Sequence, residues 1–261
     1  MDNSIKRRNF IALLAVYFAA NVIFIMSPAM NAIATELYPD LPYTSVLLVS
    51  TISSLLMIPG SLVAGAALGK VKFKTMALIS MGGIIIFGML PYFIRPLTAV
   101  YVFRGIVGFC IGLGFPLQST LALQLFNDKE RPRALGFATG SIVFMVVSGM
   151  LADQNAAYPY LFHAILIIPL ILVMTLLKEP SAEDKVETVE APSQVPETGK
   201  MPPYAIFTAF MFAVVFFAFY PVLLNMSSVC ANENIGGATV AGILLALYTV
   251  GNCIGGFIFE P

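Results

Sequence analysis

Polar side chains that could bind a solute lie inside long apolar stretches of this sequence. Apart from Arg104, they are amides and phenols, which donate and accept hydrogen bonds. A cation inside an apolar stretch is costly, so Arg104 is a functional candidate by default. The candidates for solute binding or coupling are Arg104, Asn21, Asn31, Gln118, Tyr220, Asn225, Tyr248 and Asn252. Each one taken alone is better explained as a hydrogen bond between helices, but together they suggest a cavity.

Acidic residues are missing from the middle of the same stretches. Glu36, Asp153 and Glu233 fall at their ends or in connections. If these stretches cross a membrane and the chain carries a solute, a cationic drug would be expected to need a carboxylate within the membrane, and proton coupling also lacks an obvious one. One cationic residue, Arg104, without a nearby acid favours a neutral or anionic organic solute.

The reactive residue types argue against an enzyme. The sequence has one histidine, His163, and three cysteines without a CxxC pair, so it offers no catalytic residues, no metal site and no cofactor site. We expect His163 to lie near the membrane interface without a coupling role. The formal net charge is zero and no long basic run is present, so the sequence does not predict a nucleic-acid partner.

The elements that carry these residues are long enough to span a membrane. The chain is 59% hydrophobic and only 11% charged, whereas soluble domains are about 25% charged. Continuously apolar stretches of about 20 residues are expected to be helices, because a membrane barrel would need alternating segments of about ten. The predicted spans are residues 10–37, 43–69, 73–94, 97–126, 133–154, 158–177, 203–230 and 237–259. The first is too long for a signal peptide, and a second follows at once.

Basic residues predict the orientation of these spans. The chain has 14 Lys and Arg residues. Only Arg95 lies in a connection on the side of the membrane opposite to the N-terminus. Twelve others precede the first span or lie in the second, fourth and sixth connections. Because Lys and Arg accumulate in cytoplasmic loops, the N-terminus is predicted to be cytoplasmic, in a multi-pass protein of the cell (inner) membrane.

The spans fall into two groups. Residues 1–177 form a predicted six-helix transmembrane bundle, and residues 178–202 are rich in proline and acids, which is typical of a flexible cytoplasmic linker. Residues 203–261 then repeat the start of the chain: Pro221 and Asn225 correspond to Pro28 and Asn31. The prediction is therefore a complete first bundle followed by the first two helices of a second, with four more spans expected in a longer protein.

The fourth predicted span carries a motif of known type. Arg104 is followed by Gly108, Gly112 and Gly114, and such glycines let a neighbouring helix approach closely. This motif, the six predicted helices, the long linker and the repeat that begins after it together resemble the major facilitator superfamily. The resemblance covers essentially the whole chain. The resemblance implies an all-α, polytopic bundle. It associates Arg104 with coupling and substrate response, although a structural Arg bonded to carbonyls of the first helix remains an alternative.

The connection between the second and third spans resembles the family's gating loop in part. Gly65, Lys70 and Lys74 fit the pattern, but Gly69 stands where the family has an acid. In the second copy Gly256 is followed by Glu260, which would restore that acid. The fifth span lacks the Gly-Pro pair of the family's antiporter motif, so symport or uniport is favoured over drug/proton antiport, and its glycines are interpreted as helix-packing residues.

The resemblance implies a secondary transporter that moves a small solute by alternating access. Its cavity would be lined chiefly by helices 1, 4, 7 and 10, which agrees with the clustering of the polar candidates. The expected partners are the small-molecule solute and the lipid bilayer, and the full-length protein is expected to be a monomer. The alternatives are a membrane channel, although no filter loop is visible, or a sensor that binds a solute without transporting it.

Overall fold

The computed structural model describes residues 3–68, 70–125, 141–177 and 202–258. Every extended element in these ranges is a helix, and no strand is found among them beyond an isolated bridge between Leu68 and Val71. The predicted all-α membrane bundle is therefore confirmed.

The helices follow the predicted spans closely. The first span consists of α1 (Asn3–Ala20), η1 (Asn21–Ile25), η2 (Ser27–Ala29), α2 (Met30–Ala32) and η3 (Ile33–Leu37). The next three are α3 (Tyr43–Ala67), α4 (Phe73–Phe93) and α5 (Leu97–Leu125). They are followed by α7 (Ser141–Gln154), then by α8 (Tyr158–Leu161), η4 (Phe162–Leu166) and α9 (Ile167–Leu176). The last two are α10 (Pro203–Asn232) and α11 (Ala238–Ile258).

Six helical segments of the described ranges are long and apolar enough to cross a membrane. The described parts of α7 and α11 are shorter, because most of the connection before α7 and the side chains beyond Gly251 lie outside what the structure describes. The predicted linker likewise lies outside it, except for Pro202. α10 presents an almost continuous apolar surface, with Phe217 84% exposed.

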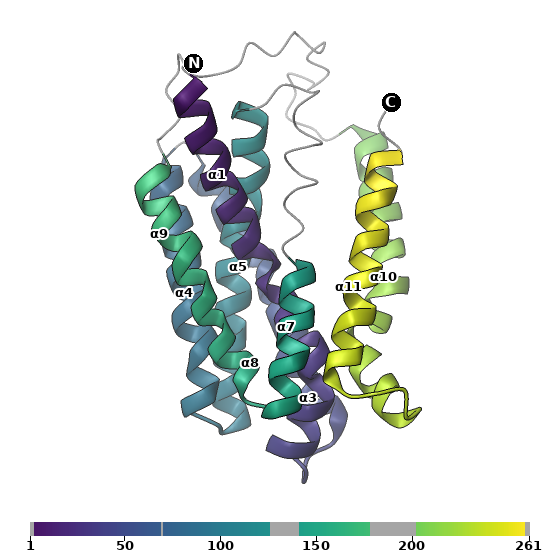
Figure 1. Cartoon of the computed structure of the whole chain (residues 1–261). Coiled ribbons are helices and arrows are strands. Elements are labelled where there is room, and N and C mark those ends of the chain that lie inside the picture. Colours follow the sequence, from purple (N-terminus) through teal and green to yellow (C-terminus); the bar gives the residue numbers. More distant parts are fainter. Residues whose placement is uncertain (1–2, 69, 126–140, 178–201, 259–261) are drawn as a thin grey trace.

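The helices run up and down between two ends of the molecule (Figure 1). The first turn of α1 and the last turn of α11 lie at the same end, as an even number of crossings requires. Lys70 and Lys72 are exposed in the connection between α3 and α4, whereas Arg95 is exposed in the connection between α4 and α5. These two connections lie at opposite ends, so the described basic residues follow the alternation read from the sequence.

The first span is broken near its middle, at Pro28. Pro28 has no N–H, and the Ala29 N–H donates to the Met26 carbonyl at 3.1 Å instead of to the Ile25 carbonyl one residue earlier. Ile25 is therefore free to accept a hydrogen bond from elsewhere, and the Ser148 hydroxyl of α7 donates to it at 2.5 Å. In a membrane interior without water, such a side chain stabilises the break.

The densest packing joins α3 to α5. A Cβ added at Gly108 would overlap the backbone of Ser53, and one added at Gly112 would overlap that of Met57. Gly60 meets the Phe109 carbonyl in the same way. Glycine is thus required at these positions because the two backbones touch, while Gly114 meets only the Ser80 hydroxyl, at 3.1 Å.

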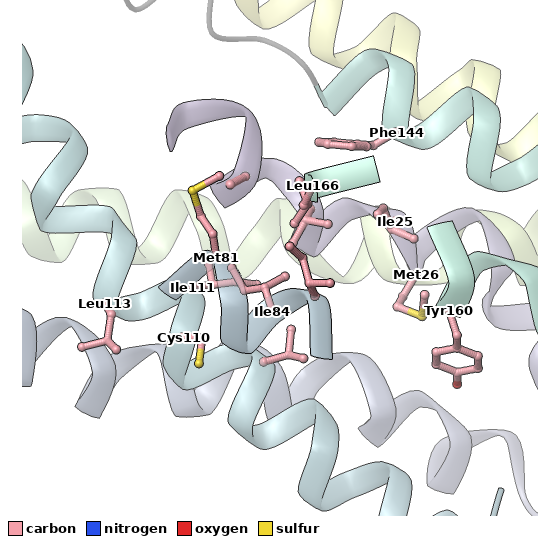
Figure 2. Packing of buried hydrophobic residues seen from close by; sticks show 14 of the residues in the cluster. Ile25, Met26, Met81, Ile84, Cys110, Ile111, Leu113, Phe144, Tyr160 and Leu166 are labelled. Carbon is pink, nitrogen blue, oxygen red and sulfur yellow. The ribbon is translucent and has the colours of Figure 1, made fainter. Parts of the chain in front are cut away.

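The remaining helices of the bundle close around an apolar core (Figure 2). Its fully buried side chains come from distant parts of the sequence, including Ile25, Met81, Ile111 and Phe144. The Phe144 ring of α7 packs against Phe18, with ring centroids 4.3 Å apart. These contacts hold the broken first span in a fixed place, which positions the polar site described next.

Candidate solute-binding cavity

A cavity of about 220 Å³ lies where the first, second and fourth spans meet α10. It is lined by Ala20, Asn21, Ile23, Phe24, Ser27, Ser50, Ser54, Met57, Phe115, Phe216, Tyr220, Leu223 and Leu224. The first span contributes five of these residues, and α10 contributes four. The cavity is therefore enclosed jointly by the first predicted bundle and by the first helix after the predicted linker.

Hydrogen bonds join the two sides of this cavity. The hydroxyls of Ser54 in α3 and Tyr220 in α10 are bonded to each other. The Ser27 hydroxyl donates to the Leu223 carbonyl, and just outside the lining the Asn31 N–H donates to the Ser227 hydroxyl at 2.9 Å. These bonds connect residues more than 160 positions apart in the sequence, so they hold α10 against the first bundle.

The polar groups of the described lining are all uncharged. They are one amide, three serine hydroxyls and one phenol, set among aromatic and aliphatic side chains, and no Asp, Glu, Lys, Arg or His occurs among the described lining residues. Such a surface can exchange hydrogen bonds with a solute and stack against its apolar faces. It offers no charge to neutralise an ionic solute.

Arg104 is fully buried and is not among the described lining residues. Its Nε donates to the Val49 carbonyl of α3 at 3.2 Å, and its Nη1 lies 3.4 Å from Nε2 of His163. Its own carbonyl accepts a hydrogen bond from Ser53 at 2.8 Å. Nη2 has no hydrogen-bond partner among the described residues. The structural alternative predicted a bond to a carbonyl of the first span. The carbonyl that Arg104 binds belongs instead to the second span.

The expected position of His163 near the membrane interface stays a prediction, but its side chain is enclosed by the protein. His163 is fully buried in η4, where its ring also fills the space beside Gly88. A guanidinium can only donate, so Nε2 of His163 must accept from Arg104, and the ring proton is assigned to Nδ1, which lies 3.0 Å from the Tyr160 carbonyl. The sequence did not reveal this because the 3₁₀ turn of η4 directs His163 inward at a position where a regular helix was assumed.

The predicted site residues are distributed over several environments. Asn21 and Tyr220 line the cavity, and Asn21 Nδ2 donates to the Tyr17 carbonyl at 2.9 Å. Gln118 is buried away from the lining, and its Nε2 has no partner among the described residues. Asn225 bonds the Pro221 carbonyl of its own helix at 2.8 Å. Tyr248 is 39% exposed, and the side chain of Asn252 lies outside the described residues.

The predicted gating-loop residues are described only in part. Gly65 has open space around it, and the Lys70 N–H closes a turn onto the Ala67 carbonyl at 3.0 Å. Lys74 is half-buried in the first turn of α4. Gly69 and Glu260 lie outside the described residues, and of Gly256 only its helical backbone in α11 is described.

Reading the sequence missed the serines that line the cavity. Serine hydroxyls in membrane helices commonly bond their own helix, so Ser27, Ser50 and Ser54 gave no strong signal. Ser50, Ser54 and Met57 are spaced by four and then three residues, which places them on one face of α3. That spacing, next to the polar residues of the first span, was the available clue.

A second junction between the two groups of helices joins α7 to α11. A Cβ at Gly149 would overlap the Ala238 carbonyl, and one at Gly242 would overlap the Met145 carbonyl. The backbones of these helices therefore touch at two points that lie one turn apart. The helices before the predicted linker thus contact those after it both at the cavity and at this junction.

Apolar helices long enough to cross a membrane, which together enclose a small cavity with a few polar groups, are typical of a polytopic membrane protein of the transporter type. The chain belongs to the Major Facilitator Superfamily, whose family model matches residues 10–260. The predicted family is therefore confirmed. A search among curated proteins finds no match.

Two solved structures show the same fold. One is a bacterial homolog of the human lysosomal transporter Spinster in an inward-facing, unoccupied conformation, with a TM-score of 0.71 and 14% identity, covering 99% of this chain and 63% of that one. The other is a D-xylose–proton symporter, with a TM-score of 0.61 and 14% identity, covering 96% of this chain and 66% of that one. This chain thus spans less than two thirds of either protein.

Proposed function

We propose that this protein is part of a secondary transporter that moves a small organic solute across the membrane by alternating access. The observation that carries the proposal is the cavity shared between the first bundle and α10. A site at the junction of two rocking bundles can open to either side in turn. The two similar structures are both of transporters by name, which supports the same proposal. An enzyme is not proposed, because the cavity holds no acid–base pair among its described residues.

The solute is proposed to be neutral, with hydroxyl or amide groups on one side and an apolar face on the other. Ser50, Ser54 and Tyr220 can exchange hydrogen bonds with it, while Phe24 and Phe216 can pack against it. The sequence alone left neutral and anionic solutes open because of Arg104. The Arg104 side chain bonds Val49 and His163 and is not among the described lining residues, which supports the neutral class.

The remaining assignments follow from the charge pattern and the fold. The N-terminus is proposed to be cytoplasmic, in the cell membrane, because the described lysines gather at the end that holds the start of α1. Residues 1–177 and 203–261 are proposed to belong to two different bundles joined by residues 178–202. The working protein is proposed to be a monomer in the lipid bilayer.

Uptake into proteoliposomes tests this function. The chain, with any further C-terminal sequence its gene encodes, would be assayed with pairs of solutes of matched size, such as xylitol and xylonate. We expect saturable uptake of neutral members of the panel, reduced at least severalfold by Tyr220→Phe. Preferential uptake of the carboxylates would contradict the neutral class. Ohmic current would indicate a channel, and saturable binding without flux would indicate a receptor.

A further inference from the structure

The N-terminus of α11 is capped by a residue of another helix. Gly237 is the N-cap residue, because its carbonyl accepts the first helical hydrogen bond, from the Ala241 N–H at 3.2 Å. The free N–H groups of Ala238 and Thr239 donate to the Asp153 carboxylate, at 2.7 Å to Oδ1 and 2.9 Å to Oδ2. Asp153 lies at the end of α7, 85 residues away from Ala238.

This arrangement separates the cap from the helix that it caps. An N-cap residue usually provides the acceptor from its own side chain, and glycine has none. A Cβ at Gly237 would lie 2.6 Å from Oδ1 of Asp153, so glycine leaves the space that the carboxylate occupies. The negative charge also faces the positive end of the α11 dipole. The helix end therefore has this carboxylate as its acceptor only while α7 and α11 stay together.

The same junction is built for close contact. Gly149 lies against the Ala238 carbonyl, directly beside the cap, and Gly242 lies against the Met145 carbonyl one turn further along. Thr249 then contacts the Met145 sulfur at 3.6 Å. These contacts bring α7 and α11 together from the Asp153 end inward. The cap is thus the outermost contact of a junction between the two groups of helices, at the end opposite to the start of α1.

We propose that Asp153 is a latch that closes this end of the junction during transport. The inference rests on the proposed alternating access, in which α7 and α11 separate when the cavity opens toward this end. Asp153 is exposed, so water can replace the two N–H donors when the helices part. Each state then has its hydrogen bonds, and the latch biases the equilibrium without locking it. A cap together with its dipole interaction corresponds to a bias of about tenfold.

Distances between spin labels at this end test the latch. Labels would be attached to Thr98→Cys in α5 and Asn232→Cys in α10, both exposed positions, in a chain whose native cysteines are replaced by alanine. With Asp153 present we expect mainly the short distance. Asp153→Ala should raise the ratio of long to short distances about tenfold, and Asp153→Asn should raise it less, since one carbonyl acceptor remains. Asp40→Asn, which removes an exposed carboxylate from another connection at the same end, should leave the ratio unchanged.

A double variant separates a latch from a simple helix cap. Asp153→Ala makes room for a side chain at Gly237, so Asp153→Ala with Gly237→Ser gives α11 a cap of its own that does not reach α7. A latch predicts that the double variant regains the melting temperature but keeps the long distances. Return of the short distances would overturn the latch, and so would an unchanged ratio in Asp153→Ala. If the unmodified protein shows no measurable uptake but Asp153→Ala still raises the ratio of long to short distances tenfold, the proposed transport is contradicted and the latch is supported.

Discussion

Replacing Gly108 by alanine should separate α3 from α5 at the closest point of the first bundle. The added Cβ would overlap the Ser53 carbonyl oxygen, carbon and Cα, all of which belong to the backbone. No flexible side chain can move aside. The Ser53 hydroxyl also holds this point by donating to the Arg104 carbonyl at 2.8 Å. Relief of the overlap therefore requires a shift of one whole helix.

The expected magnitude follows from two opposing effects. Overpacking in a closely packed core costs about 1–3 kcal/mol. Alanine regains up to about 1 kcal/mol of helix propensity over glycine. The net loss for Gly108→Ala is therefore about 0–2 kcal/mol, which should lower the melting temperature of the detergent-solubilised protein by up to several degrees.

A matched control uses a glycine with free space around it. A Cβ at Gly82 in α4 would have no atom within 4 Å, so Gly82→Ala should leave the melting temperature unchanged or raise it slightly. The difference between the two alanine variants isolates the contact between α3 and α5. A Gly108→Ala protein that melts at or above the Gly82→Ala protein would refute the reasoning.

Three further predictions concern the cavity and its supports. Arg104→Leu should lower the free energy of unfolding by about 1–3 kcal/mol, because it removes the bonds to Val49 and His163. The Kd for a neutral solute should change less than about threefold. A larger change in the free energy of binding than in that of unfolding would place Arg104 at the solute. In a double-mutant cycle, Ser54→Ala and Tyr220→Phe should show a coupling energy in solute binding of about 0.5–1.5 kcal/mol, whereas additive effects would mean that their mutual bond does not matter. Ser148→Ala should lower the melting temperature by leaving the Ile25 carbonyl without its donor, and an unchanged melting temperature would mean that the break needs no such partner.

Much of the fold could be predicted from the sequence because membrane helices are defined by length and apolar composition. α3, α4 and α5 begin at the predicted residues and end within two residues of the predicted ends. The alternation of Lys and Arg also predicted which connections share an end of the molecule. These features depend on local sequence and on the thickness of the bilayer, so no knowledge of tertiary contacts was needed.

The cavity was less predictable because it depends on how the helices rotate and break. Arg104 could be assigned to a span but not to a direction around it, since periodicity is weak in a span that is apolar all round. Whether it faces Val49 and His163 or the solute is decided by the α3–α5 contact and by the turn at η4. The Asp153 cap is another case: nothing in the sequence indicates that an acid at the end of one helix meets the glycine N-cap of another, 85 residues away from Ala238.

Accessibility of the cavity from the two sides of the membrane tests alternating access most directly, without requiring the identity of the solute. Ser50→Cys places a thiol in the cavity lining, and Ser53→Cys places one in the contact between α3 and α5 as a control. Both would be made in a background without native cysteines and treated with a membrane-impermeant thiol reagent added to one side at a time.

The account predicts two states. In one state the Ser50→Cys thiol reacts only with reagent added to the first side of the membrane, and in the other state only with reagent added to the second side. Asp153→Ala should raise its reactivity from the side that holds Asp153 and lower it from the opposite side. The Ser53→Cys thiol should remain unreactive throughout. Reactivity of Ser50→Cys that rises from both sides together, accompanied by ionic current, would contradict a carrier, and so would reactivity from one side only under every condition.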